Sequence, residues 1–277
     1  MINQPTTIEI KNFLAEDIGS GDITASIIPA SRQAKANVIT REKMVLCGQA
    51  WFENIFKTLS PEVTINWFKK EGEVCEENAL LCELNGSARD LLTGERTALN
   101  LLQTLSYTAS IARQYADAVS GTQCKVLDTR KTIPGLRNAQ KYAVSCGGCF
   151  NHRTGLYDGV LIKENHIMAA GSIALAISSA RKITDVIVEV EVESLDEYRQ
   201  ALEAKPDRIM LDNFSNADMK TAVALNKTDI DLEASGDITL KTIRKVAETG
   251  VDYISIGALT KHVKAIDLSM RIIMETE

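Results

Sequence analysis

The sequence lacks the features that mark exported, membrane-spanning and nucleic-acid-binding proteins. Its first residues, MINQPTTIEIKNFLAEDIG, contain no basic segment followed by an apolar one, so we expect no signal peptide. It has no uncharged apolar run long enough to span a bilayer. Its formal net charge of -6 argues against a nucleic acid or an anionic membrane as partner. With 277 residues, 45% of them hydrophobic and 25% charged, the chain has the composition of a globular protein that buries a substantial core.

The sequence also lacks a complete metal-binding or redox cysteine motif. Its six cysteines lie mostly in apolar strand or helix patterns, as reduced core thiols do, so we expect a cytoplasmic protein. Cys146-Gly-Gly-Cys149 has no second CxxC to complete a zinc site, and it follows a helical pattern rather than a thioredoxin-like strand. We therefore expect His152, just beyond it, to contact a ligand instead.

The first 95 residues alternate between helical and strand-like spacing, which predicts a small α+β domain. We expect helices at 7–15 and 49–59 and strands at 34–41, 63–68 and 79–84, the last ending at an Asn85-Gly86 turn. A long helical pattern then covers 91–118 and links this domain to the rest. Its buried stripe is predicted to comprise Leu99, Leu102, Leu105 and Ile111.

After Gly121, short β-branched strands alternate with helices, which predicts parallel βαβ units covered on both faces. Strands are expected near residues 125, 159, 186, 208, 230 and 252, and helices at 137–146, 172–181, 196–204, 216–225 and 240–248. A doubly wound sheet would fit, but a closed or nearly closed barrel fits better because polar residues follow every strand. Six strands argue against a full eight-stranded barrel. An amphipathic pattern from residue 264 on predicts a last helix, 264–277, that packs on the first domain.

A basic region lies inside this acidic chain. Residues 96–163 contain nine Lys or Arg and three Asp, which suggests a local anionic ligand. Arg130, Lys131, Arg153 and Lys163 follow strands of this region, where arginine forks suit carboxylates and phosphates. The alternative is that they are solvated surface charges. Lys163 could also form a Schiff base, as in a class I aldolase.

Carboxylates and glycines follow the later strands. Glu191 and Asp212 end consecutive strands, where they could ligate Mg²⁺, stabilise a developing positive charge, or merely neutralise the arginines. Glu189 shares the face of Glu191 one layer deeper, so the assignment between them stays open. Ser235-Gly236 and Gly257-Ala258 fit a phosphate site at the last two strands, but also ordinary turns.

Several long segments in order resemble the quinolinate phosphoribosyltransferase family over nearly the whole chain. They are EDIGSGDIT (16–24), GERTALN (94–100), DTRKTIPGLR (128–137), NHRTGLYDGVLIKENHI (151–167), VEVEVESL (188–195), IMLDNF (209–214), EASG (233–236) and ISIGALT (254–260). The resemblance implies an α/β sandwich domain at 1–110 followed by an incomplete TIM-like α/β barrel at 111–263. It also implies a homodimer that converts quinolinate and phosphoribosyl pyrophosphate (PRPP), with Mg²⁺, to nicotinate mononucleotide, pyrophosphate and CO₂.

The same resemblance implies a role for individual residues. Arg96 reaches a quinolinate carboxylate from the partner subunit, while Arg130 and Arg153 bind quinolinate with help from Thr129, Lys131 and His152. Lys163 meets either substrate, and Lys131, Lys163, Glu191 and Asp212 form the catalytic set. Glu191 and Asp212 also contact the ribose hydroxyls, and they hold Mg²⁺ indirectly or through PRPP. Ser235, Gly236, Gly257 and Ala258 take the 5′-phosphate.

Two positions depart from the family pattern, and three rival functions stay open. After GALT, members of the family read either His-Ser or, as here, Lys261-His262, so a phosphate role of these two positions stays open, and Cys149 stands where glycine is commoner. The rivals are the Schiff-base aldolase, a molybdenum-transport-associated homologue and a non-catalytic anion-binding protein. The second would be expected to lose the LIKENH pattern of 161–166, which this chain keeps, and the third would not need Glu191 and Asp212 opposite the cations.

Overall fold

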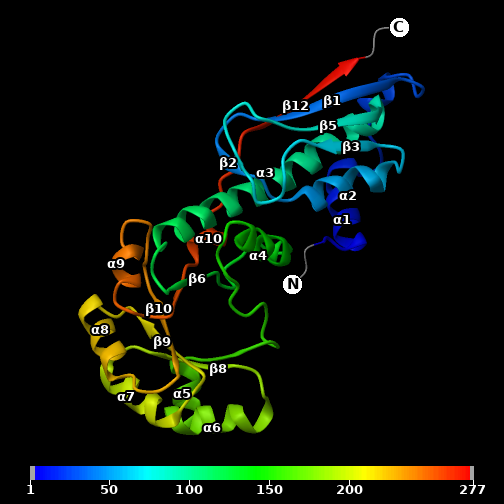
Figure 1. The fold of residues 1–277 in the computed structure, drawn as a ribbon. Helices are drawn as coiled ribbons and strands as arrows, with labels where there is room; N and C mark the ends of the chain where they lie inside the picture. The colour runs from blue at the N-terminus through cyan, green and yellow to red at the C-terminus, as the bar shows by residue number, and fades with distance from the viewer. Residues whose placement is uncertain (1–3, 275–277) are drawn as a thin grey trace. The chain divides into compact units, whose positions relative to one another are not determined.

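A computed structural model describes residues 4–274, which form two compact units (Figure 1). The first unit contains the chain up to Arg113, the segment Asn138–Gly148 and the segment from His262 on. The second contains Gln114–Arg137 and Cys149–Lys261. Within residues 4–274, no helix combines the length and the apolarity that crossing a membrane requires.

The first unit is built on an antiparallel sheet of strand order β12-β1-β5-β3. Its other elements are three helices, a short 3₁₀ helix at Ala25–Ile27, most of α4 and the small pair β2-β4. The bounds are α1 Thr7–Ile18, β1 Gln33–Thr40, β2 Met44–Val45, α2 Gln49–Leu59, β3 Thr64–Trp67, β4 Val74–Cys75, β5 Leu80–Ser87, α3 Ala88–Ala118, α4 Arg137–Cys146 and β12 Leu268–Met274.

The core of this unit follows from the period of each element. Every second residue of β1 is buried, while α2 buries Trp51, Phe52, Ile55 and Phe56 at helical spacing. The Phe52 ring lies 5.1 Å from that of Phe56 and 5.4 Å from that of Trp67, measured between centroids. Of the stripe predicted for α3, Leu99, Leu102 and Leu105 are buried, whereas Ile111 is only partly so.

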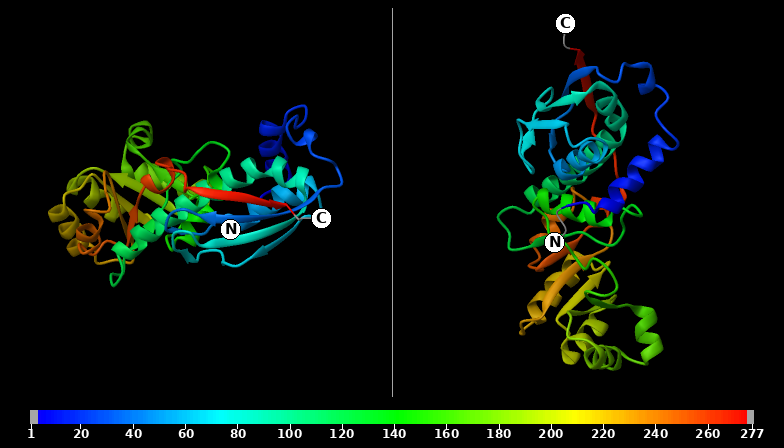
Figure 2. Two further views of the ribbon diagram at one scale, coloured as in Figure 1. Left: turned by 90° about the horizontal axis from the view of Figure 1, so that it is seen from above. Right: turned by 90° about the vertical axis from the view of Figure 1, so that its right-hand side faces the viewer.

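The predicted last helix was wrong. Residues Leu268–Met274 form the strand β12, which pairs antiparallel with residues 34–40 of β1 (Figures 1 and 2). The amphipathic pattern was real, but an unpaired edge of β1 offers the segment backbone partners that a helix would not use. The Asn85-Gly86 turn was wrong for the same reason, because β5 runs through to Ser87 in register with β1. Residues 275–277 of the predicted helix lie outside the described residues.

The second unit is a six-stranded parallel sheet of order β6-β11-β10-β9-β8-β7. Helices connect successive strands and pack against them, as the alternating pattern predicted. The bounds are β6 Lys125–Leu127, β7 Val160–Ile162, α5 Glu164–Ala170, α6 Ile173–Ile183, β8 Val188–Val192, α7 Leu195–Ala204, β9 Arg208–Asp212, α8 Asn216–Leu225, β10 Asp231–Ser235, α9 Ile243–Ala247, β11 Tyr253–Ser255 and α10 Ala258–Lys261.

The strand order shows an incomplete barrel. The last strand, β11, pairs with the first, β6, as barrel closure requires. The first two strands, β6 and β7, are not neighbours in the sheet, and only a single bridge from Leu127 to Phe150 extends the β6 edge. The barrel is therefore open between β6 and β7, which confirms the predicted fold class.

Serine caps fix where the helices of this unit begin. The hydroxyls of Ser172, Ser194 and Ser215 each accept the backbone N–H of the residue three positions on, at 3.2 Å, at the starts of α6, α7 and α8. The helix α5 was missed by the sequence analysis, although it begins directly after Lys163. It therefore carries Glu164, Asn165 and His166 of the LIKENH segment.

Candidate active site

A cavity of about 290 Å³ lies at the carboxyl ends of the parallel strands. Thirteen residues line it, all of them from the second unit: Thr129, Arg130, Lys131, His152, Arg153, Leu161, Lys163, Glu191, Met210, Asp212, Glu233, Ser235 and Ser255. The first three and His152, Arg153, Lys163, Glu191, Asp212 and Ser235 were predicted from the sequence. The strand ends therefore do meet in one pocket, as in other parallel barrels.

Asp128 organises the loop on the β6 side of this pocket. It is fully buried, and its carboxylate accepts the side-chain N–H of Asn151 at 2.7 Å and the backbone N–H of His152 at 2.9 Å. The backbone N–H of Asp128 in turn donates to the carbonyl of Phe150 at 3.0 Å. A buried carboxylate that accepts several N–H groups holds a loop in one conformation. Asp128 thus orients the His152-Arg153 segment without lining the cavity.

The arginines of the pocket keep their charge unneutralised. None of Arg130, Lys131 and Arg153 forms an ion pair with a carboxylate of the described residues. Arg153 donates to the carbonyl of Gly159 at 3.0 Å, and its pKa is lowered by burial and by the nearby positive charge of Arg130. The Nε of Arg130 is buried without a hydrogen-bond partner. Neighbouring cations with unused donors make this wall a binding site for an anion.

Beneath His152 lies a buried network of two carboxylates. The backbone N–H of Arg153 donates to Nδ1 of His152 at 2.8 Å, which leaves Nε2 to face Oε2 of Glu189 at 2.8 Å and Oε2 of Glu233 at 3.5 Å. Burial is the main cause that raises the pKa of both Glu189 and Glu233. Arg208 offsets part of that cost through a 3.0 Å ion pair with Glu233. Both ring nitrogens of His152 therefore have partners within the protein, and these contacts hold the ring in one orientation at the cavity surface.

The cavity is also lined by carboxylates at the ends of β8 and β9. Glu191 forms an ion pair with Lys163, whose backbone N–H donates to Nδ1 of His166 at 3.0 Å at the start of α5. Asp212, at the end of β9, accepts the side-chain N–H of Asn213 at 2.8 Å. The structure therefore separates the two candidates left open by the sequence: Glu191 lines the cavity, whereas Glu189 lies below it, 2% exposed.

The loops after β10 and β11 are closely packed around glycines. Gly236 has φ +105°, and a Cβ there would lie 2.1 Å from Oδ1 of Asn213. A Cβ on Gly257 would lie 3.1 Å from the side chain of Lys131. Of the described lining residues, only Ser235 comes from the predicted phosphate loops; Gly236, Gly257 and Ala258 border the cavity in sequence but do not line it. Arg96 is an exposed residue of α3 in the first unit.

Four lining residues were missed by sequence reasoning: Leu161, Met210, Glu233 and Ser255. Leu161, Met210 and Glu233 each lie two positions before a polar residue. That polar residue either ends the same strand or comes directly after it. Since side chains alternate along a strand, a residue two positions earlier points to the same side, one layer deeper. That period was a usable signal for Glu233, which precedes Ser235 in β10.

An open parallel α/β barrel whose pocket sets unneutralised arginines against carboxylates defines an enzyme that acts on anionic substrates. Its family follows from two matching family models. "Quinolinate phosphoribosyl transferase, N-terminal domain" matches residues 22–106, and "Quinolinate phosphoribosyl transferase, C-terminal domain" matches residues 108–271. The chain belongs to the quinolinate phosphoribosyl transferase family.

Individual relatives agree over nearly the full length. A "probable nicotinate-nucleotide pyrophosphorylase [carboxylating]" of Bacillus subtilis is 40% identical over 97% of this chain and 93% of its own. A mitochondrial "quinolinate phosphoribosyltransferase [decarboxylating] 2b" of Nicotiana tabacum is 38% identical over 95% of this chain and 81% of its own. The solved nicotinate-nucleotide pyrophosphorylase of Francisella tularensis superposes with a TM-score of 0.94 at 47% identity, over 99% of both chains.

Proposed function

We propose that the chain transfers the phosphoribosyl group of PRPP to quinolinate and releases pyrophosphate and CO₂, giving nicotinate mononucleotide for de novo NAD biosynthesis. Family membership over the whole chain supports this reaction. The observation that carries it is the polarity of the pocket. Arg130, Lys131 and Arg153 line the same cavity as Glu191 and Asp212.

The cationic wall fits quinolinate, which carries two adjacent carboxylates. Arg130 and Arg153 bind them with their guanidinium forks, and Thr129 and Lys131 complete the contacts. His152 holds its ring against this wall through the Glu189 contact, which fixes the plane on which the pyridine rests. These contacts leave the ring nitrogen to face the sugar.

The carboxylate wall fits the phosphoribosyl group. As the bond from ribose C1 to pyrophosphate breaks, positive charge develops on the sugar ring, and Glu191 and Asp212 stabilise it. The pyridine nitrogen then bonds to C1, and Lys163 balances the departing pyrophosphate. The glycosylated nitrogen is cationic, so it stabilises the electron pair that stays on the adjacent ring carbon when the carboxylate leaves as CO₂, and that carbon then takes a proton. Ser235, Gly236, Gly257 and Ala258 hold the 5′-phosphate through the loops after β10 and β11.

We propose Mg²⁺ as the metal of this reaction, since the pocket offers the oxygen donors that this ion prefers. Mg²⁺ usually takes one or two carboxylates together with substrate phosphates, and Glu191 and Asp212 are two such carboxylates at neighbouring strand ends. They would hold the ion chiefly through PRPP, because Lys163 and Asn213 already contact them. The bound ion would neutralise charge on pyrophosphate.

We further propose a homodimer in which Arg96 of the partner subunit completes the quinolinate site. Its side chain is exposed on α3, and no other residue of the GERT segment could reach a carboxylate with a planar fork. Mixing Arg96→Ala subunits with Arg153→Ala subunits should restore part of the activity, because a hybrid dimer has one intact site. No recovery after proven subunit exchange would rule out the shared site. A mixture of Arg130→Ala and Arg153→Ala subunits is the control and should stay inactive, because both residues line the cavity of the same subunit.

We propose that the reaction takes place in the cytoplasm. None of the six cysteines, all of which lie among the described residues, forms a disulfide, which suits a reducing compartment. Fractionation of the native cell with an antibody against the chain would test this, and recovery in an exported or organellar fraction would contradict it.

The Schiff-base aldolase is disfavoured because the Lys163 amine is held by the Glu191 carboxylate rather than left available to attack a carbonyl. The proposed function is tested by offering quinolinate or nicotinate with PRPP and Mg²⁺ and following nicotinate mononucleotide. We expect turnover with quinolinate only. Turnover with nicotinate alone, or borohydride trapping of a substrate adduct on Lys163, would overturn the proposal.

A further inference from the structure

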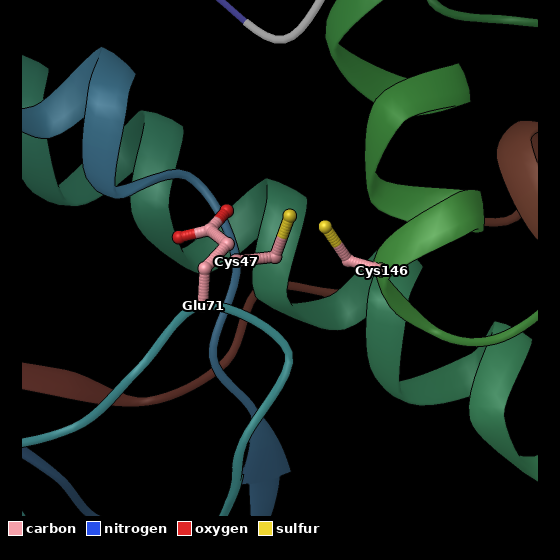
Figure 3. Close-up of side chains that lie close together, drawn as sticks. All are labelled: Cys47, Glu71 and Cys146. Atoms are coloured by element: carbon pink, nitrogen blue, oxygen red, sulfur yellow. The ribbon is translucent and has the colours of Figure 1, made fainter.

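A cluster of two thiols and a carboxylate lies in the first unit and shares no residue with the proposed active site, which is built from the second unit. Cys47 follows β2, Cys146 ends α4, and Glu71 lies in the turn between β3 and β4. One ligand atom of each, the two sulfurs and a carboxylate oxygen, lie within 4.8 Å of one another. Figure 3 shows the two sulfurs pointing toward each other with Glu71 behind Cys47. The proposed reaction uses none of these groups.

The backbone holds both cysteines in place. The N–H of Cys47 donates to Oγ of Ser106 at 3.0 Å, and the Ser106 hydroxyl donates to the Cys47 carbonyl at 3.1 Å. Directly after Cys146, Gly147 lies so close to α3 that a Cβ would be 2.4 Å from the carbonyl of Ala109. Since neither backbone can shift easily, the two sulfurs would have to reach bonding distance through rotation of their side chains.

The two thiols differ in exposure and in acidity. Cys47 is completely buried, and burial raises its pKa well above the usual value, so it stays a thiol. Cys146 is partly exposed, and hydrogen bonds from Cys47 and then Tyr142 lower its pKa. A partly exposed thiol of lowered pKa beside a buried thiol is the arrangement of an attacking and a resolving cysteine.

Glu71 is positioned to take part in such a reaction. Its carboxylate accepts the backbone N–H of Gly48 at 2.7 Å and that of Gln49 at 3.1 Å at the start of α2. These bonds fix its oxygens beside the Cys47 sulfur, where a carboxylate can accept the thiol proton.

We propose that Cys47 and Cys146 are a reversible oxidation site that closes to a disulfide by exchange with a low-molecular-weight disulfide. The Cys146 thiolate attacks one sulfur of the small disulfide, whose S–S bond breaks to release a first thiolate. The Cys47 sulfur then attacks Cys146 in the mixed disulfide as its proton passes to Glu71. The second small thiolate leaves and takes that proton. Two protein thiols are oxidised and one small disulfide is reduced to two thiols.

The test treats the reduced full-length chain with oxidised glutathione in the presence of a chelator, followed by intact mass and peptide mapping. Wild type should lose the mass of two hydrogen atoms and yield a Cys47–Cys146 cross-linked peptide that dithiothreitol reverses. Cys47→Ser, and Cys47→Ala in case serine unfolds the chain, should stop at one glutathione on Cys146. Cys146→Ser should gain none. Glu71→Gln should prolong the mixed disulfide by roughly tenfold, as expected when a general base is lost.

Cys149→Ser is the matched control, because it removes the other thiol of the CGGC segment and should leave the cross-link unchanged. A cross-link between Cys146 and Cys149 would overturn the proposal, as would wild-type thiols that stay unreactive. Without the chelator, uptake of Zn²⁺ that Cys47→Ser abolishes while the thiols resist glutathione would make the cluster a metal site and also overturn it.

Discussion

Replacing Glu189 by Gln should change how the stability of the second unit depends on pH. Burial, with a further contribution from Glu191, raises the pKa of Glu189 to about 7 from a usual value of 4.5, although Arg208 and Arg153 oppose the shift. The folded state therefore binds this proton more tightly than the unfolded state does. Its stabilising contribution is complete below pH 4.5 and is lost as the pH rises through about 7.

The size of the effect follows from the shift. At about 1.4 kcal/mol per unit, a pKa moved from 4.5 to about 7 corresponds to about 3 kcal/mol of unfolding free energy. Gln is neutral at every pH and nearly isosteric with Glu, so the unfolding free energy of the variant does not show this fall as the pH rises. Glu233 shares the network and titrates together with Glu189, so the transition belongs to the pair.

Urea unfolding of both proteins between about pH 5 and pH 8.5 measures the difference. The wild type should lose about 3 kcal/mol relative to Glu189→Gln across that interval. Glu203→Gln, at an exposed position of α7, is the control and should run parallel to wild type. If Glu189→Gln also runs parallel to wild type, the carboxylate is ionised throughout and our account of the buried network is wrong.

Three further predictions concern the pocket. Arg153→Lys keeps the charge but loses the planar fork, so the KM for quinolinate should rise roughly 10- to 100-fold in steady-state assays, while Arg199→Lys changes nothing. Asp128→Asn weakens the acceptor of the His152 backbone N–H. It should lower the free energy of unfolding, measured in urea, by about 1.5–3 kcal/mol and should also lower kcat. Unchanged stability would mean that the loop does not depend on the Asp128 carboxylate. Gly236→Ala places a side chain on a residue whose φ is +105°. It should lower the free energy of unfolding by about 1–3 kcal/mol and raise the KM for PRPP. A stable, fully active variant would contradict the observed loop conformation.

Sequence patterns predicted the barrel better than the first unit. The bounds of α2, α4 and α8 agree with the predicted helices, and each barrel strand begins within two residues of its predicted start. These elements have an unbroken period or a clear cap. The tail Leu268–Met274 and the Asn85-Gly86 segment were mispredicted because their structure depends on pairing with β1, which is distant in sequence. The division at 110/111 followed the family resemblance, and neither that resemblance nor the change of pattern after Gly121 indicated that Asn138–Gly148 groups with the first unit.

The residues of the candidate site that lie at the strand ends could be predicted from the sequence. Polar residues at strand ends are visible in the sequence, and nine of those predicted line the cavity. For the layer below, the strand period indicated Glu189 and could have indicated Glu233, but it could not show that Arg208 joins them, because the sheet brings these residues together from different strands. Asp128 was visible as a polar residue after a strand, but its role in holding the His152 loop depends on contacts across that loop.

The central claim is that one pocket joins phosphoribosyl transfer to decarboxylation of quinolinate. Its most direct test supplies quinolinate labelled in the carboxylate next to the ring nitrogen, with PRPP and Mg²⁺, and measures labelled CO₂ against nicotinate mononucleotide. We predict that the two appear in equal amounts and that neither forms when PRPP is omitted. A nucleotide product that retains the label, or CO₂ released without nucleotide, would contradict the account.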